Sequence, residues 1–136
     1  SKVYAVDPAM FGAFSPASAL DQGQRLETAV FNALRRRTPA VRVGSVCRLL
    51  IKEKSKNHEV DFVAGDALLM RAYSLIQVSV DMASEKTRER EIAALDASMA
   101  QFDLGESAIV TMDEQADIPC EHGVVHVVPA WKWLLA

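Results

Sequence analysis

Two absences narrow the class of protein to which this chain belongs. It has no run of roughly 18 uncharged apolar residues, the length that a membrane-spanning helix needs. Its N-terminus also lacks the basic and apolar stretches of a secretion signal. Its only two cysteines, Cys47 and Cys120, lie far apart without paired spacing. A disulfide framework is therefore not indicated, and we expect a cytoplasmic protein with no membrane partner and with reduced thiols.

The length and composition are those of one compact domain. The chain has 136 residues, of which 50% are hydrophobic. A chain of this size buries enough apolar surface to form a core without disulfides. We therefore expect a single domain over residues 1–136.

Positive charge is concentrated in one segment, although the net charge of the chain is -3. Eight basic residues and one acid lie between positions 35 and 56, whereas residues 57–136 hold five basic and fourteen acidic side chains. Such a band could contact phosphates, and its candidate nucleic-acid-binding residues are Arg35, Arg36, Arg37, Lys52 and Lys54. A structural role stays open as well, because basic side chains protect edge strands and favour the last turn of a helix.

Hydrophobic periodicity predicts strands and helices in a definite order. Strands are expected over residues 2–6, 43–54, 59–64, 72–80, 107–112 and 124–128, with short hairpin turns between the second, third and fourth. Helices are expected from an N-cap at Asp21 to residue 37, from an N-cap at Ser84 to residue 102 with Gly105 closing it, and over residues 131–135. This order predicts an α/β fold with a mixed central sheet flanked by helices.

Polar side chains interrupt the apolar pattern of these elements. Glu27 borders the apolar stripe of the first long helix, and Asp61 interrupts an otherwise apolar strand. Because side chains alternate along a strand, Glu59, Asp61 and Val63 are expected on one face. A partly buried carboxylate needs a hydrogen bond, a cation or a metal. Glu27 could instead form a salt bridge without any functional role. Asp61 could instead form hydrogen bonds to nearby backbone groups.

The order helix, three-strand meander, helix, strand resembles the core of the PD-(D/E)XK nucleases, which have the restriction-endonuclease-like fold. In that fold a Glu from the first helix, an Asp on one strand and a Glu-x-Lys on the next converge on a divalent metal such as Mg²⁺. The matching positions here make Glu27, Asp61 and Gln77 the candidate catalytic residues, with Asp61 and Gln77 as metal ligands. Ser79 stands where the lysine would be, and Lys52 or Lys54 on the neighbouring strand could replace it.

Seven strings together resemble the uncharacterised C-terminal domain of prokaryotic AAA-type P-loop ATPases. They are KVYAVD at 2–7, RLETAVFNALRR at 25–36, EVDFV at 59–63, LIQVS at 75–79, TRERE at 87–91, IVT at 109–111 and VVPAWKWLL at 127–135. The resemblance implies a nuclease-like domain that follows an ATPase module in a longer chain and has that module as its partner. Members of that family often carry a lysine where this chain has Ser79. The chain itself has no Gly-x-x-x-x-Gly-Lys-[Ser/Thr] motif.

Three functions follow from these expectations. The first, which we favour, is a catalytically degenerate nuclease-like domain that serves as a regulatory, nucleic-acid-binding or interaction module of an ATPase. The second is an active Mg²⁺-dependent nuclease that uses Asp61 with a relocated lysine. The third is a purely structural docking domain.

A smaller group of metal-binding residue types lies near the C-terminal end. Cys120, His122 and His126 surround a glycine turn but lack a matched pair of ligands elsewhere in the sequence. Zinc sites normally show paired spacing. We therefore interpret these three residues as a chance cluster.

Overall fold

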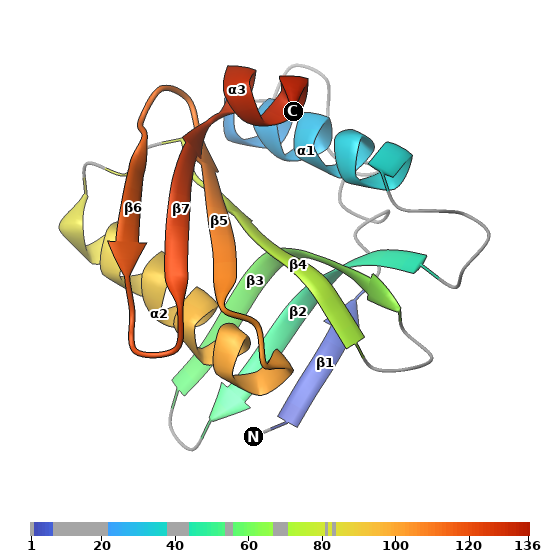
Figure 1. Ribbon diagram of the computed structural model, residues 1–136, viewed down its shortest axis with the longest axis vertical. Helices are drawn as coiled ribbons and strands as arrows, with labels where there is room; N and C mark the ends of the chain where they lie inside the picture. Colours follow the sequence, from blue (N-terminus) through green and yellow to red (C-terminus); the bar gives the residue numbers. More distant parts are fainter. Residues whose placement is uncertain are drawn as a thin grey trace.

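The computed structural model describes residues 2–6, 22–37, 44–53, 56–66, 71–80, 82 and 84–136, and it places the side chains at 23–37, 59–65, 74–80, 82 and 84–136. In these residues, seven strands form one sheet that three helices accompany (Figure 1). The predicted α/β fold with a mixed sheet is confirmed at this level. None of the helices in the described part of the chain is long and apolar enough to cross a membrane.

The elements follow one another in nearly the predicted order. The strands are β1 (Lys2–Val6), β2 (Gly44–Glu53), β3 (Lys56–Asp66), β4 (Arg71–Val78), β5 (Glu106–Thr111), β6 (Ala116–Pro119) and β7 (Val124–Pro129). The helices are α1 (Gln22–Arg37), α2 (Glu85–Phe102) and α3 (Ala130–Leu135). The sheet order is β1-β2-β3-β4-β5-β7-β6. Strands β1 to β4 pair antiparallel, whereas β4 with β5 and β5 with β7 pair parallel. Helix α2 supplies the crossover that the parallel pair β4 and β5 requires.

Of the two capping residues predicted for α2, one is confirmed and one is wrong. Ser84 caps the helix as predicted, because its side-chain oxygen accepts a hydrogen bond of 3.4 Å from the Thr87 N–H. The last residue of the helix is Phe102, as predicted, but its C-cap is Asp103 rather than Gly105. Asp103 takes the left-handed conformation with φ 54°, which Asp tolerates better than most residues. The predicted N-cap of α1, Asp21, lies outside the described residues.

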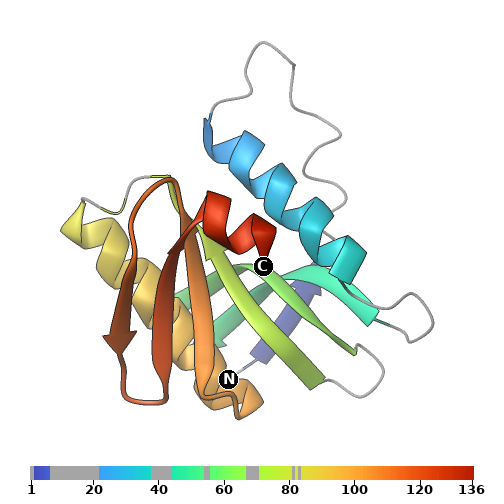
Figure 2. The ribbon, with the colours of Figure 1, turned by 45° about the horizontal axis from the view of Figure 1, so that its top comes forward.

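The two faces of the sheet carry separate apolar clusters. Helix α2 covers one face, and α1 with α3 covers the other (Figure 2). The α2 cluster contains Val60, Val63, Leu75, Met82, Ala94, Leu95, Met99, Ile109, Val125 and Val127. The opposite cluster contains Leu26, Val30, Leu34, Phe62, Ala64, Ile76, Val78 and Val110. The sheet is therefore buried on both sides, as expected of a sheet with parallel central strands.

Strand β3 contains a bulge at the position of the predicted site. Cys47 pairs with Val63 and Leu49 with Val60, so one residue of β2 faces two residues of β3, Asp61 and Phe62. Val60 and Val63 consequently pack into the same cluster although they are three positions apart. The predicted face shared by Glu59, Asp61 and Val63 is therefore wrong, because strict alternation fails across a bulge.

Candidate functional site

The two predicted metal ligands, Asp61 and Gln77, lie on the neighbouring strands β3 and β4. The side chain of each forms hydrogen bonds to backbone groups of the other strand. The Asp61 N–H donates to Gln77 Oε1 at 2.8 Å, and Gln77 Nε2 donates to the Glu59 carbonyl at 2.7 Å. The Val78 N–H donates to Asp61 Oδ2 at 2.8 Å. Three hydrogen bonds between side chains and backbone therefore connect β3 with β4 at this point.

These bonds begin where the regular pairing of β3 with β4 ends. The backbone ladder runs from the pair Asp66 and Arg71 to the pair Phe62 and Ile76. Beyond Phe62 the bulged strand no longer aligns its backbone with β4, and the side chains of Asp61 and Gln77 make the connection. A buried backbone group without a hydrogen bond costs about 1–3 kcal/mol, so each of these bonds stabilises the sheet locally.

The role of Gln77 requires an amide rather than a carboxylate. Its oxygen accepts from the Asp61 N–H while its nitrogen donates to the Glu59 carbonyl, and the residue is only 2% exposed. An ionised glutamate could accept the first bond but has no hydrogen for the second. The identity of residue 77 thus has a structural explanation that involves no metal.

Ser79 occupies the position predicted for a catalytic lysine. The residue is buried, and its N–H donates to the Val110 carbonyl of β5 at 3.0 Å. This bond ties the end of β4 to the parallel strand β5. The site therefore has a short hydroxyl side chain where the resemblance implies an ammonium group.

Acidic side chains from β3 and α1 act on Glu91 of α2 near the β3 bulge. Glu91 of α2 has its pKa raised from 4.5 to about 7, chiefly by burial and then by the negative charge of Asp61. Glu59 and Glu27 raise this pKa further, whereas Arg90 lowers it. Arg90 lies 3.8 Å from the Glu91 carboxylate but is itself largely exposed. The carboxylates of β3, α1 and α2 thus share one region of negative potential.

Glu91 was not among the residues predicted for the site. Its signal in the sequence is the same as that of Glu27, because each borders the buried stripe of its helix. Glu91 comes four residues before the fully buried Leu95, and its side chain is 15% exposed. The two exposed charged residues before it, Glu89 and Arg90, give the segment the character of a solvated face. Glu27 lies half-buried on α1, as its place at the border of the stripe indicates.

A coordination shell is not formed by these carboxylates alone. We searched the part of the chain whose side chains are placed for three or more His, Cys, Asp or Glu residues with ligand atoms within 4.8 Å of one another. One such group exists there, and it consists of Asp96, Glu121 and His122. Glu27, Asp61 and Glu91 are close enough for their charges to act but do not converge to that extent. Metal binding by Asp61 and Gln77 therefore stays a prediction.

The basic band has a structural role at one of its residues. Arg35, Arg36 and Arg37 are all exposed at the end of α1. Arg37 Nη2 donates to the carbonyls of Trp133, Leu134 and Ala136, and its guanidinium lies 4.3 Å from the centre of the Trp133 ring. Arg37 therefore holds α3 against α1. The Lys52 side chain and the whole of Lys54 lie outside the described residues.

The residues of the C-terminal group, Cys120, His122 and His126, have separate partners. His126 Nδ1 lies 2.7 Å from Asp117 Oδ1, and this hydrogen bond is the main cause that raises its pKa. The Cys120 thiol donates to the Ile118 carbonyl at 3.6 Å, and burial raises its pKa. His122 contacts Asp96 of α2. The three do not form one site.

Comparison of the chain with family models, with curated proteins and with solved structures gave no match. The nuclease-like and ATPase-associated expectations therefore have no support from a relative. They rest on the strings and the order of elements in the sequence alone.

Proposed function

We propose that this domain is a catalytically degenerate relative of the PD-(D/E)XK nucleases and serves as an interaction module of an AAA-type ATPase. One observation carries the proposal: both polar atoms of the Gln77 side chain bond to the backbone of β3. The amide that replaces a catalytic carboxylate has become part of the sheet. The ATPase is proposed as the partner because seven sequence strings resemble the C-terminal domain of such ATPases.

The chemistry of phosphodiester hydrolysis explains why these replacements matter. Mg²⁺ needs several oxygen ligands in a near-octahedral arrangement, and a nearby ammonium group stabilises the developing charge. Here the Gln77 oxygen already accepts from the Asp61 N–H, and Asp61 Oδ2 accepts from the Val78 N–H. Ser79 offers a neutral hydroxyl in place of the ammonium. We therefore assign Asp61 and Gln77 to holding β3 and β4 together rather than to catalysis.

A cleavage assay tests the absence of catalysis. The purified chain is incubated with plasmid DNA, linear DNA and RNA in the presence of Mg²⁺ or Mn²⁺, and we expect no cleavage above the level of a buffer control. Cleavage that disappears in Asp61→Ala would overturn the proposal. Folding of that variant is checked by circular dichroism, so that lost activity is not confused with unfolding.

A substitution at position 77 tests the structural role directly. Gln77→Glu removes the donor to the Glu59 carbonyl and adds a buried negative charge near Asp61. We expect a loss of about 2–4 kcal/mol in the free energy of unfolding at pH 8, measured by urea denaturation. The exposed Gln115→Glu is the matched control and should change stability by less than about 0.5 kcal/mol. If Gln77→Glu loses no more stability than Gln115→Glu does, the bonds of Gln77 do not stabilise the sheet and the structural role proposed for it is wrong.

The interaction role is tested with the ATPase module of the parent chain. The two parts are purified separately and mixed, and we expect a complex on size-exclusion chromatography. If this domain instead binds DNA, the affinity should fall steeply with salt, and Arg36→Gln should reduce that dependence. Arg37 is unsuitable for that test, because it holds α3. Failure to bind either the ATPase module or nucleic acid would remove the module hypothesis.

One observation favours the second candidate, an active Mg²⁺-dependent nuclease with Asp61 and a relocated lysine. Burial and the negative charge of Asp61 raise the pKa of Glu91, and a divalent cation between the acidic residues would stabilise its ionised form. The cleavage assay separates the two candidates, because only the active enzyme would cut nucleic acid in a manner that depends on Asp61.

A further inference from the structure

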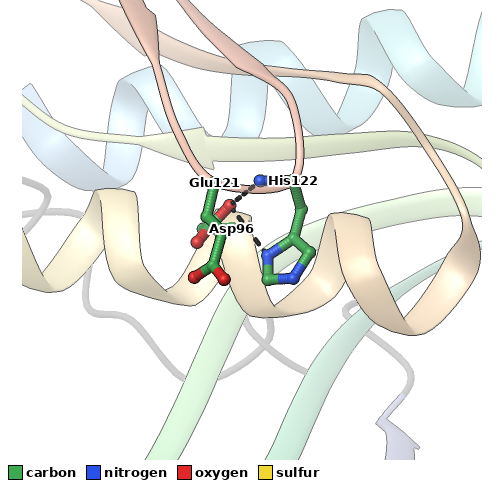
Figure 3. A group of neighbouring side chains, drawn as sticks. All are labelled: Asp96, Glu121 and His122. Atoms are coloured by element: carbon green, nitrogen blue, oxygen red, sulfur yellow. Dashed lines mark hydrogen bonds and ion pairs between the residues drawn. The ribbon is translucent and has the colours of Figure 1, made fainter.

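A group of metal-ligating side chains joins α2 to the turn between β6 and β7. Asp96 comes from the middle of α2, and Glu121 with His122 comes from the turn (Figure 3). One ligand atom of each residue lies within 4.8 Å of the other two. These residues belong to elements other than the β3 bulge, so they form a second region of polar chemistry.

The backbone positions this group independently of any bound ion. The His122 N–H donates to Asp96 Oδ1 at 2.9 Å, and His122 Nδ1 lies 3.2 Å from the same oxygen. The turn itself is closed by a bond of 2.7 Å from the Cys120 N–H to the Gly123 carbonyl. The Val124 N–H donates to the Gly105 carbonyl at 3.0 Å, which fixes the turn beside the end of α2. Asp96 and His122 would lose little conformational entropy on binding, because their hydrogen bonds already hold them near each other.

We propose that Asp96, Glu121 and His122 form a binding site for a first-row divalent transition-metal ion, with Zn²⁺ as the best-suited occupant. Imidazole nitrogen and carboxylate oxygen are both ligands of Zn²⁺, and three protein ligands leave positions for water. The imidazole selects against Mg²⁺, which prefers oxygen ligands only. Asp96 is 22% and His122 is 42% exposed on its side chain, so an ion reaches the group from solvent.

The second exposed histidine of this region provides an internal contrast. His126 also lies between two carboxylates, with Nδ1 at 2.7 Å from Asp117 and Nε2 at 3.4 Å from Glu106. Both of its ring nitrogens are therefore directed at carboxylates, and the three residues do not meet the distance that unites Asp96, Glu121 and His122. His126 has the same residue types around it but not the same convergence, which makes it the matched control.

The experiment is a titration of the intact, chelator-treated chain with Zn²⁺ by isothermal calorimetry, repeated with Mg²⁺. We expect one Zn²⁺ ion per chain and Mg²⁺ binding at least about tenfold weaker. Co²⁺ as a coloured substitute should give a visible absorption that Zn²⁺ abolishes. His122→Asn should weaken Zn²⁺ binding by about 10–100-fold, whereas His126→Asn should leave it within about twofold of the wild type.

A second variant keeps the test informative if His122→Asn disturbs the turn. Glu121 is exposed, so Glu121→Gln should retain the circular dichroism spectrum and thermal midpoint of the unliganded chain. It should nevertheless weaken Zn²⁺ binding by about tenfold or more. Absence of stoichiometric Zn²⁺ binding would overturn the proposal. So would Zn²⁺ binding that survives Glu121→Gln and His122→Asn unchanged, or that is lost in His126→Asn.

Discussion

The raised pKa of Glu91 predicts that replacing this residue by glutamine stabilises the domain above neutral pH. Glu91 is half-buried on α2, and the charges of Asp61, Glu59 and Glu27 act on it in addition to burial. Its folded-state pKa of about 7 lies above the value of 4.5 expected in the unfolded chain. Glutamine has nearly the same shape and carries no charge at any pH.

The sign and the size of the effect follow from linkage. Between pH 4.5 and about 7 the folded state binds the Glu91 proton more tightly than the unfolded state does, so the free energy of unfolding falls as pH rises through this window. The two pKa values differ by an amount that corresponds to about 3.4 kcal/mol if solvent screening is ignored. For a side chain that is 15% exposed, screening reduces this to about 2 kcal/mol. The cost is absent below pH 4.5 and complete above about pH 7.5.

Urea denaturation at half-unit intervals from pH 4.5 to 8.5 measures this difference. Glu91→Gln should match the wild type in stability at the acid end and exceed it by about 2 kcal/mol at the alkaline end. Glu89→Gln, on an exposed residue of the same helix, removes the same charge and is the control. Parallel pH curves for the wild type and Glu91→Gln would refute the reasoning, and so would an equal gain in Glu89→Gln.

Two further substitutions test how the helices and turns are held. Gly123→Ala would place its Cβ in collision with the Gly105 carbonyl oxygen, so the free energy of unfolding in urea should fall by about 1–3 kcal/mol. Gly105→Ala has nothing within 4 Å of its Cβ and should lose much less stability. Arg37→Lys keeps the charge but loses the planar guanidinium that lies over the Trp133 ring, so stability should fall by about 1 kcal/mol and the tryptophan fluorescence should change. Arg36→Lys is the control and should do neither.

Local periodicity predicts most of this fold because strands and helices bury different spacings of apolar residues. Strand β1 and helix α3 have their expected places, and α2 begins after the predicted cap, Ser84. Strand β6 was missed because four residues are too few for an alternating pattern to stand out and because the segment ends in Pro119. Such a short edge strand is defined by its pairing with β7, which the pattern of its own four residues does not reveal.

The sequence predicts that Asp61 and Gln77 lie near each other, but it does not predict the geometry around them. Asp61 and Gln77 are adjacent on β3 and β4, as their positions on consecutive strands indicate. Their bonds to backbone depend on the bulge opposite residue 48, which no alternation pattern reveals. The same limit applies to Asp96 and His122, because 26 positions separate them and only the packing of the β6–β7 turn on α2 brings them together.

The bonding of Gln77 also bears on how such a sheet could gain or lose catalysis. A carboxylate at position 77 would leave the Glu59 carbonyl without its donor and would add negative charge beside Asp61, where Glu91 already resists ionisation. A divalent cation would compensate for the charge, since it attracts all of these oxygens at once. Without the metal, however, the carboxylate variant is destabilised. An amide at this position therefore lets the sheet fold independently of metal supply, which suits a domain whose proposed task is interaction with an ATPase.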